Sequence, residues 1–250
     1  MKTMTFFSPK GGVGKTTLTF LFADYLKYRL GASVRVMDAE HPKHPIMHFR
    51  ETDLAAADQP GAVLYNYFQT RQRPEPYPIQ CVGRAINEYD SDDVRKFAWM
   101  VNKEIESNKY EYLLLDFPAG YSEKTPISCL IHNHLIDAVI VPMSTESQER
   151  LDAYTLGRLL IEEKQPHLLL WNRIKKKFWG DGSALDLAEK DLAQYGLECC
   201  KTRIREFNKA SEDADIRCFV RNTLCWPDRY VEMACPELVT LFEEIVSFLG

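Results

Sequence analysis

A glycine-rich segment near the start of the chain, residues 9–17 with the sequence PKGGVGKTT, constrains the fold more than any other feature. Glycines let the backbone curl so that several N–H groups point inward, and a helix that starts directly afterwards adds its partial positive charge. The apolar run 4–8 before the segment and the helical pattern over 16–30 supply the strand and helix that such a loop needs. The segment therefore predicts a site for the phosphate groups of a nucleotide. Its candidate binding residues are Gly11, Gly12, Val13, Gly14, Lys15, Thr16 and Thr17.

Two side chains of this loop have a specific chemistry. Lys15 is placed to reach the β- and γ-phosphates, and the hydroxyl of Thr16 is placed to hold Mg²⁺. A plain glycine turn is a poor alternative, because strand, loop and helix follow one another in the required order. The loop departs from the common G-x-x-x-x-G-K-[ST] form, since Pro9 stands where the first glycine belongs and Lys10 follows it.

Two aspartates stand at the ends of predicted strands. Asp38 follows the apolar run 34–37, and Asp116 follows the run 112–115 in the apolar-then-Asp pattern of a Walker B carboxylate. The carboxyl ends of parallel strands face the ligand crevice, so both residues are candidates for the site. Asp116 would hold Mg²⁺ together with Thr16. For Asp38 the plainer alternative is a turn residue at a strand end.

The chain as a whole has the pattern of an α/β fold. Continuous apolar strands are expected at 4–8, 34–37, 112–115, 138–141 and 168–171. Helices are expected at 16–30, 92–107, 147–163, 185–195 and 236–249. This alternation predicts a P-loop NTPase with a mainly parallel, twisted sheet and helices on both faces. Because no linker interrupts the sequence, we expect a single domain over 1–250, with one or two helices and long loops in 41–90.

With Lys10 included, the loop resembles the K-G-G-x-G-K-[ST] signature of the deviant Walker A ATPases, the family of ParA, MinD, Soj and the nitrogenase iron protein. It looks nearest to ParA-type proteins, including those of Bacteroidetes conjugative transposons. The motifs that carry the resemblance lie within residues 1–175. The resemblance implies ATP or ADP and Mg²⁺ as ligands. It also implies a homodimer in the ATP state, in which Lys10 reaches across to the partner's nucleotide as a catalytic cation.

The resemblance assigns further roles outside the loop. Asp38 would orient the attacking water, as a catalytic residue beside Lys10 and Lys15, although Glu40 stands where the family has a second aspartate. Gly120, which ends the segment DFPAG, would donate its N–H to the γ-phosphate. Asn172 matches the position that hydrogen-bonds adenine, with a turn asparagine as the alternative. The adenine loop is expected near 202–205 or 226–228.

The main functional hypothesis is a ParA-type ATPase that dimerises on binding ATP and Mg²⁺ and hydrolyses ATP slowly. Its implied role is partition or maintenance of a plasmid or conjugative element, with a ParB-like protein as activator. Two alternatives stay open: a nucleotide-gated DNA-binding adaptor with negligible turnover, and a metabolic P-loop ligase. Phosphate release measured with and without DNA separates the ATPase from the adaptor, and absence of DNA binding at low salt favours the ligase.

The charge of the chain does not by itself indicate a nucleic-acid partner. The net charge is −5, so binding of non-specific DNA would need a local basic patch. Solvated surface charge is the alternative interpretation of the basic residues. The candidates for the patch are the segment 173–179, with Lys175, Lys176 and Lys177 beside Phe178 and Trp179, and the later Arg203, Arg205, Arg217 and Arg221.

Cysteines and apolar runs indicate the compartment. The seven cysteines form no C-x-x-C pair, and no signal peptide precedes them, so we expect reduced thiols in a cytoplasmic protein that associates with the nucleoid if it binds DNA. A metal or iron–sulfur role for the cysteines is the alternative. Apolar runs are of strand length, and the helix expected at 236–249 has an acidic polar face, which predicts core packing and no membrane contact.

Overall fold

A computed structural model of the chain describes residues 1–82, 91–178, 184–206, 222–226, 231 and 234–250, and it has a six-stranded sheet at its centre. The strands are β1 Lys2–Phe6, β2 Val34–Asp38, β3 Ile79–Cys81, β4 Tyr112–Asp116, β5 Ala138–Met143 and β6 His167–Trp171. Their order across the sheet is β3-β2-β4-β1-β5-β6, and every pair is parallel. The carboxyl ends of all six strands therefore lie along one edge.

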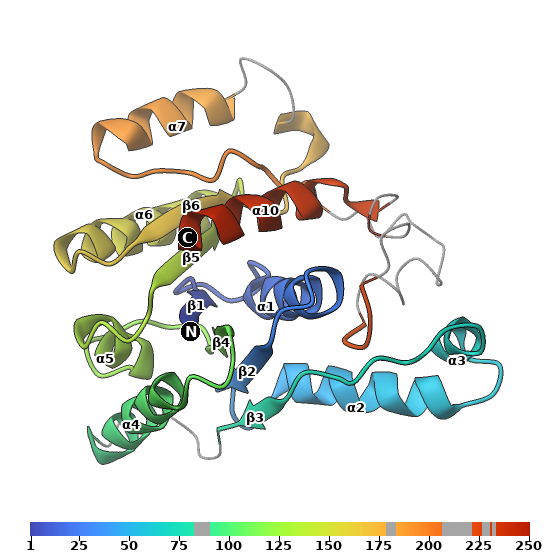
Figure 1. Ribbon diagram of the computed structural model, residues 1–250. Coiled ribbons are helices and arrows are strands. Elements are labelled where there is room, and N and C mark those ends of the chain that lie inside the picture. The colour runs from blue at the N-terminus through green and yellow to red at the C-terminus, as the bar shows by residue number, and fades with distance from the viewer. Residues whose placement is uncertain (83–90, 179–183, 207–221, 227–230, 232–233) are drawn as a thin grey trace.

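Helices cover both faces of this sheet. They are α1 Lys15–Asp24, α2 Pro45–Asp58, α3 Val63–Phe68, α4 Ser91–Ser107, α5 Pro126–His132, α6 Ser147–Glu162, α7 Ala184–Gln194 and α10 Glu237–Leu249. Figure 1 shows α1 and α10 on one side of the strands and α4, α5 and α6 on the other. Alternate residues of each strand point into two separate apolar cores, so that Met4 belongs to the α1 side and Leu113 to the α4 side. The predicted parallel sheet with helices on both faces is confirmed.

Some elements differ from the sequence prediction. The helix expected over 16–30 is α1 only to Asp24, and a π-helical turn, Tyr25–Arg29, completes it before Gly31 ends the segment at φ 72°. The short edge strand β3 and the helix α5 were not predicted. β3 has three residues, all half-buried, so the sequence contains no apolar run there that would predict a strand. Residues 83–90 of the unclear region 41–90 lie outside the described part.

The C-terminal helix packs in the core, as predicted. Leu238, Leu241, Phe242, Ile245 and Leu249 are buried against the α1 side of the sheet. The ring of Phe242 lies 5.1 Å from that of Phe22, measured between ring centroids. Among the described helices, none combines the length and the apolar character needed to cross a membrane.

Candidate functional site

The glycine-rich loop joins β1 to α1 at the carboxyl edge of the sheet. Gly12 and Gly14 have φ angles of 81° and 97°, which favour glycine, and Gly14 accepts the first hydrogen bond of α1, from the N–H of Leu18 at 2.9 Å. Lys15 is buried, and its ammonium group donates a hydrogen bond of 2.9 Å back to the carbonyl oxygen of Lys10. The lysine thus spans the loop, as a phosphate-binding lysine must, while Lys10 itself is exposed.

The environment of Lys15 is both buried and acidic. Burial lowers the pKa of its ammonium group, and the negative charges of Asp116 and Glu40 partly offset this effect. A buried cation with two carboxylates close enough to interact with it suits a ligand that carries phosphate together with a metal ion.

Asp116, at the end of β4, is fully buried, and neither of its carboxylate oxygens has a hydrogen-bond partner within the described chain. Burial raises its pKa to about 8, and the charge of neighbouring Asp38 adds to the rise. The Thr16 hydroxyl and the Lys15 charge offset part of it, although Thr16 does not satisfy either oxygen. A buried carboxylate without partners beside a hydroxyl fits a divalent cation, so the predicted pair of Thr16 and Asp116 is compatible with Mg²⁺.

Asp38, at the end of β2, differs from Asp116 because its carboxylate accepts hydrogen bonds from the backbone. Its Oδ2 accepts hydrogen bonds from the N–H groups of Ile46 at 3.0 Å and Met47 at 3.3 Å, and its Oδ1 accepts one from Glu40 at 3.2 Å. Asp38 therefore caps the N-terminus of α2, where an anionic acceptor is favoured. Its predicted role of orienting water stays a prediction, because in this arrangement its oxygens are occupied by the protein's own backbone.

Glu40 is a candidate that the residue-by-residue prediction did not select. It is half-buried, and its charge acts on both Lys15 and Asp116. The exposed ammonium of Lys43 lies 3.9 Å from its carboxylate. The signal was available in the sequence, since Glu40 occupies the second acidic place after the strand. Of the two carboxylates of Asp38 and Glu40, that of Glu40 is the one that remains accessible to a ligand.

The residues that follow β6 form the opposite wall of the loop. Asn172 donates from Nδ2 to the carbonyl oxygen of Val13 at 2.8 Å, and Arg173 donates from Nη1 to the carbonyl oxygen of Gly12. A Cβ atom on Gly14 would lie 2.6 Å from Nδ2 of Asn172, so this approach requires glycine at that place. Asn172 thus contacts the phosphate loop, and its predicted hydrogen bond to adenine stays a prediction.

The structure also bears on the position of the adenine loop. Ile204 donates its N–H to the Trp171 carbonyl at 2.8 Å and accepts from the N–H of Ile174 at 3.0 Å, so residues 202–205 run beside the end of β6 and next to Asn172. Trp226 instead packs in the core, with its ring 5.4 Å from that of Tyr25. This favours 202–205 over 226–228, of which 227 and 228 lie outside the described residues.

Gly120 connects the segment after β4 to the phosphate loop. It has a φ of 104°, and its N–H donates to the carbonyl oxygen of Pro9 at 2.9 Å. Its predicted hydrogen bond to a γ-phosphate stays a prediction, and it would require this N–H to leave Pro9. Because of this contact, a movement of the phosphate loop would act directly on the segment after β4.

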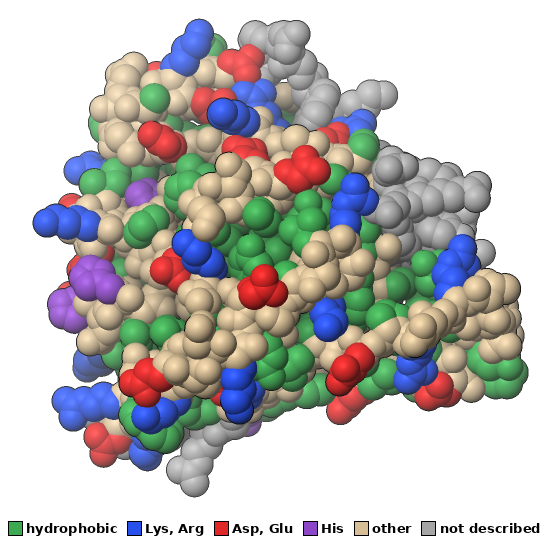
Figure 2. Space-filling model, in the orientation of Figure 1, with side chains coloured by type: hydrophobic (Ala, Val, Ile, Leu, Met, Phe, Trp, Pro, Cys, Tyr) green, Lys and Arg blue, Asp and Glu red, His purple; other side chains and the backbone are tan. Residues whose placement is uncertain are grey.

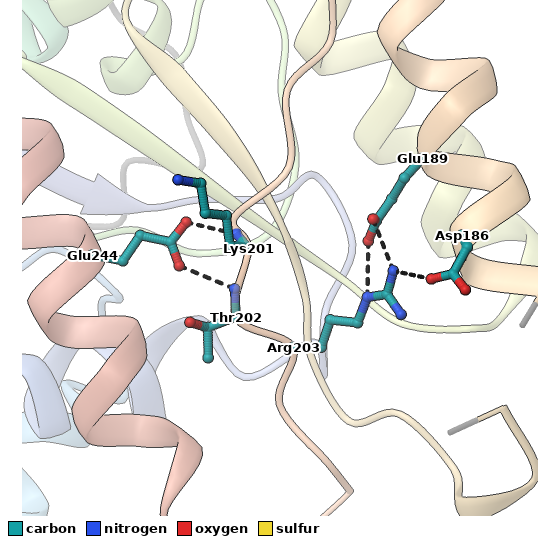
Figure 3. Close-up of polar contacts among 6 residues, drawn as sticks. All are labelled: Asp186, Glu189, Lys201, Thr202, Arg203 and Glu244. Atoms are coloured by element: carbon teal, nitrogen blue, oxygen red, sulfur yellow. Dashed lines mark hydrogen bonds and ion pairs between the residues drawn. The ribbon is translucent and has the colours of Figure 1, made fainter. Parts of the chain in front are cut away.

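The basic residues proposed as a DNA patch are largely paired with acids. Arg203 contacts Asp186 at 2.5 Å and Glu189 at 2.8 Å, both on α7, while Glu244 of α10 accepts hydrogen bonds from the backbone N–H groups of Lys201 and Thr202 (Figure 3). Figure 2 shows acidic and basic side chains interspersed over the visible face. These contacts anchor the segment after α7 and leave less free positive charge than the sequence suggested.

Two of the basic residues that follow β6 are also paired with acids. Lys175 contacts Glu146 at 2.6 Å, and Arg173 lies 3.9 Å from Glu206. Arg205 contacts Glu237 at 2.5 Å, and the ammonium of Lys177 lies 4.8 Å from the centre of the Phe178 ring. Trp179, Arg217 and Arg221, which were also named for the patch, lie outside the described residues. The DNA-binding patch stays a prediction that the described contacts do not favour.

No protein-family model matches this chain, and no curated protein does either. Solved structures share its fold. The MinD cell division protein of Aquifex aeolicus has a TM-score of 0.64 at 20% identity, over 99% of this chain and 98% of that one. The septum site-determining protein MinD of Pyrococcus horikoshii, complexed with Mg-ADP, has a TM-score of 0.61 at 18% identity, over 100% and 97%.

A third similar structure is a candidate plasmid partition protein of Borrelia burgdorferi bound to AMPPNP. It has a TM-score of 0.60 at 16% identity, over 98% of this chain and 99% of that one. The three likenesses confirm the predicted P-loop NTPase fold over almost the full length. At these identities they show the fold alone.

Proposed function

We propose that this protein is an ATPase of the ParA and MinD type, which binds ATP with Mg²⁺, dimerises in that state and hydrolyses ATP slowly. The observation that carries the proposal is the fully buried carboxylate of Asp116, which lacks hydrogen-bond partners among the described residues and lies beside Thr16 and Lys15. The proteins of the same fold that are complexed with Mg-ADP or bound to AMPPNP support ATP or ADP and Mg²⁺ as the ligands.

The chain's own groups divide the work of binding. The backbone N–H groups of residues 11–17 would receive the phosphates, and Lys15 would exchange its bond with the Lys10 carbonyl for one with the β- and γ-phosphates. Thr16 and Asp116 would hold Mg²⁺, which supplies neutralisation of phosphate charge when bound. Asn172 and residues 202–205 would border the adenine.

Hydrolysis needs a carboxylate that orients water and a cation that stabilises the negative charge developing on the transferred phosphoryl group. Glu40 is the carboxylate free to orient water, and Asp38 is the alternative if it releases α2. Lys10 is exposed, so it is available to a second copy of the chain. Because no contact within the described part of the chain holds the Lys10 side chain in place, we expect turnover to be slow without a partner.

The biological role that we propose is coarse: positioning or partition of a cellular cargo, with a ParB-like activator as the kind of partner. Proteins of this fold described as a cell division protein and as a candidate plasmid partition protein support that class of role. Arg203 and Lys175 are paired with acids, so they do not support binding of non-specific DNA. Such binding stays in the proposal only for other basic residues. No comparison supports the link to conjugative transposons.

The test is the molar mass of the protein in solution, measured by light scattering with ATP and Mg²⁺ and again with ADP. We expect a dimer with ATP and a monomer with ADP. Lys10→Ala should bind nucleotide as the unchanged protein does but should fail to dimerise or hydrolyse, whereas Lys15→Ala should lose nucleotide binding. Lys109→Ala is the matched control, because Lys109 is an equally exposed lysine that precedes β4 at the opposite edge of the sheet. Equal mass in both nucleotides would overturn the dimer switch.

A further inference from the structure

Helix α2 is attached to the rest of the protein by an unusual inner face. Its buried residues are Ile46, Arg50 and Ala57, so a guanidinium group lies at the centre of the face where an apolar side chain is usual. Ile46 and Arg50 are four residues apart and thus on the same side of the helix. At its first turn the helix is capped by Asp38 of β2, which connects the helix to the candidate site.

Arg50 makes several contacts at once. It donates from Nε to Oγ1 of Thr223 at 3.0 Å and from Nη1 to the carbonyl oxygen of Tyr77 at 2.8 Å, and its guanidinium lies 4.3 Å from the centre of the Tyr77 ring. These partners come from the segment before β3 and from residues 222–226, so Arg50 connects α2 to two parts of the chain that are distant in sequence.

Arg50 also acts electrostatically on a buried acid. Asp24, at the end of α1, is 1% exposed, and neither of its oxygens has a hydrogen-bond partner among the described residues. Burial raises its pKa well above the ordinary value, and the positive charge of Arg50 is the largest effect that opposes the rise. The charge of Arg50 therefore acts on Asp24 without a direct ion pair between the two described side chains.

Thr223 completes the cluster with all of its polar atoms engaged. Its N–H and hydroxyl both donate to Oδ2 of Asp53, at 2.7 and 2.8 Å, and its carbonyl accepts from the hydroxyl of Tyr28 at 3.0 Å. Residues 222–226 therefore lie between the end of α1 and α2, visible in Figure 1 as the orange-red segment above α2. Hydrogen bonds are directional, so this network fixes the position of α2 more strictly than apolar packing would.

We propose that Arg50 is a positioning residue for the candidate site. By tying α2 to Tyr77 and Thr223, it keeps the first turn of α2 over the Asp38 carboxylate, and it thereby fixes the strand end that carries Asp38 and Glu40. The consequence for hydrolysis rests on the proposed function, whereas the consequence for the cap of α2 does not.

The test measures amide hydrogen exchange in the full chain without nucleotide. The double variant Arg50→Met with Asp24→Asn removes the guanidinium and the buried carboxyl group. In it, the N–H groups of Glu40, Ile46 and Met47, which donate to Asp38, should exchange at least about tenfold faster. Exchange in residues 9–17 and in β4 should stay within about twofold of the unchanged protein. In phosphate release, kcat should fall while KM for ATP stays the same.

A milder pair of variants covers the case in which the double variant does not fold. Thr223→Val keeps the shape but removes the hydroxyl that Arg50 and Asp53 use, and it should speed the same amides by a smaller factor. Thr52→Val is the matched control, since Thr52 is exposed on the same helix and its hydroxyl donates to the His48 carbonyl of that helix. Faster exchange throughout the sheet, or no change at residues 40–47, would overturn the positioning role. Absence of any ATP hydrolysis in the unchanged protein would sink the proposed function and leave the exchange result standing.

Discussion

The carboxyl ends of β2 and β4 are neighbours, and each ends in a buried aspartate, yet the protein treats the two in opposite ways. Asp38 and Asp116 are paired in register across the sheet. Asp38 accepts three backbone hydrogen bonds and caps a helix, whereas Asp116 accepts none from the described residues. The same residue type at the same edge therefore serves two purposes, which its immediate partners decide.

The difference shows which carboxylate is reserved for a ligand. Burial raises the pKa of both residues, but for Asp38 the backbone N–H groups work against the rise, while for Asp116 the rise reaches about 8. Native proteins leave few buried polar atoms without partners, and the exceptions often mark a functional group. Asp116 carries this cost because its partner is expected to come from outside the chain.

The largest effect on turnover is expected from a substitution of Asp116, the aspartate without hydrogen-bond partners among the described residues. Asp116→Asn keeps the shape but removes the charge that would hold Mg²⁺, so Mg²⁺-dependent phosphate release should fall by about a thousandfold. Binding of ATP in the presence of a chelator should stay the same, because the loop and Lys15 are untouched. A fluorescent ATP analogue measures binding, and a coupled phosphate assay measures turnover. Unchanged Mg²⁺ dependence in this variant would remove Asp116 as a metal ligand.

The next effect is on stability as the pH changes. The folded protein holds the Asp116 proton up to about pH 8, whereas the unfolded chain releases it near pH 4, so the folded state binds more protons in between. The free energy of unfolding should therefore fall as the pH rises, by about 2 kcal/mol between pH 6 and pH 8 without nucleotide. Urea unfolding of Asp116→Asn should show a flatter dependence. If the variant and the unchanged protein lose stability in parallel, Asp116 is not the group responsible.

Sequence predicts one side of this comparison better than the other. The loop and Asp116 belong to local patterns, apolar strands and the residues that end them, so their place in the fold follows from the sequence. The cap that Asp38 provides depends on where the first turn of α2 lies in space, which no local pattern states. Arg50 stands at an inward position of α2 and bonds to Thr223, far along the chain. A charged residue at an apolar position weakens the periodicity, and this explains why residues 41–90 were the least predictable part.

The smallest effect tests the other half of the comparison. Asp38→Asn retains one acceptor oxygen but replaces the other by an amide that cannot accept from the first turn of α2, so the free energy of unfolding should fall by about 1 kcal/mol. Turnover should fall less than about tenfold, because the residue acts through the position of α2. Glu40→Gln should do the reverse, with stability unchanged and turnover lower by about a hundredfold. Urea unfolding and phosphate release, measured on both variants, give the four values.

The two variants serve as controls for each other, because both replace a switch carboxylate by its amide within one short segment. If Asp38→Asn abolishes turnover with no loss of stability, then Asp38 leaves the cap of α2 during the reaction and acts on water itself. The cap would then be a contact of the resting protein, and α2 would be released each time that the site closes on ATP. In that case Glu40→Gln should have little effect, and the contrast between the two strand ends would hold only before nucleotide binds.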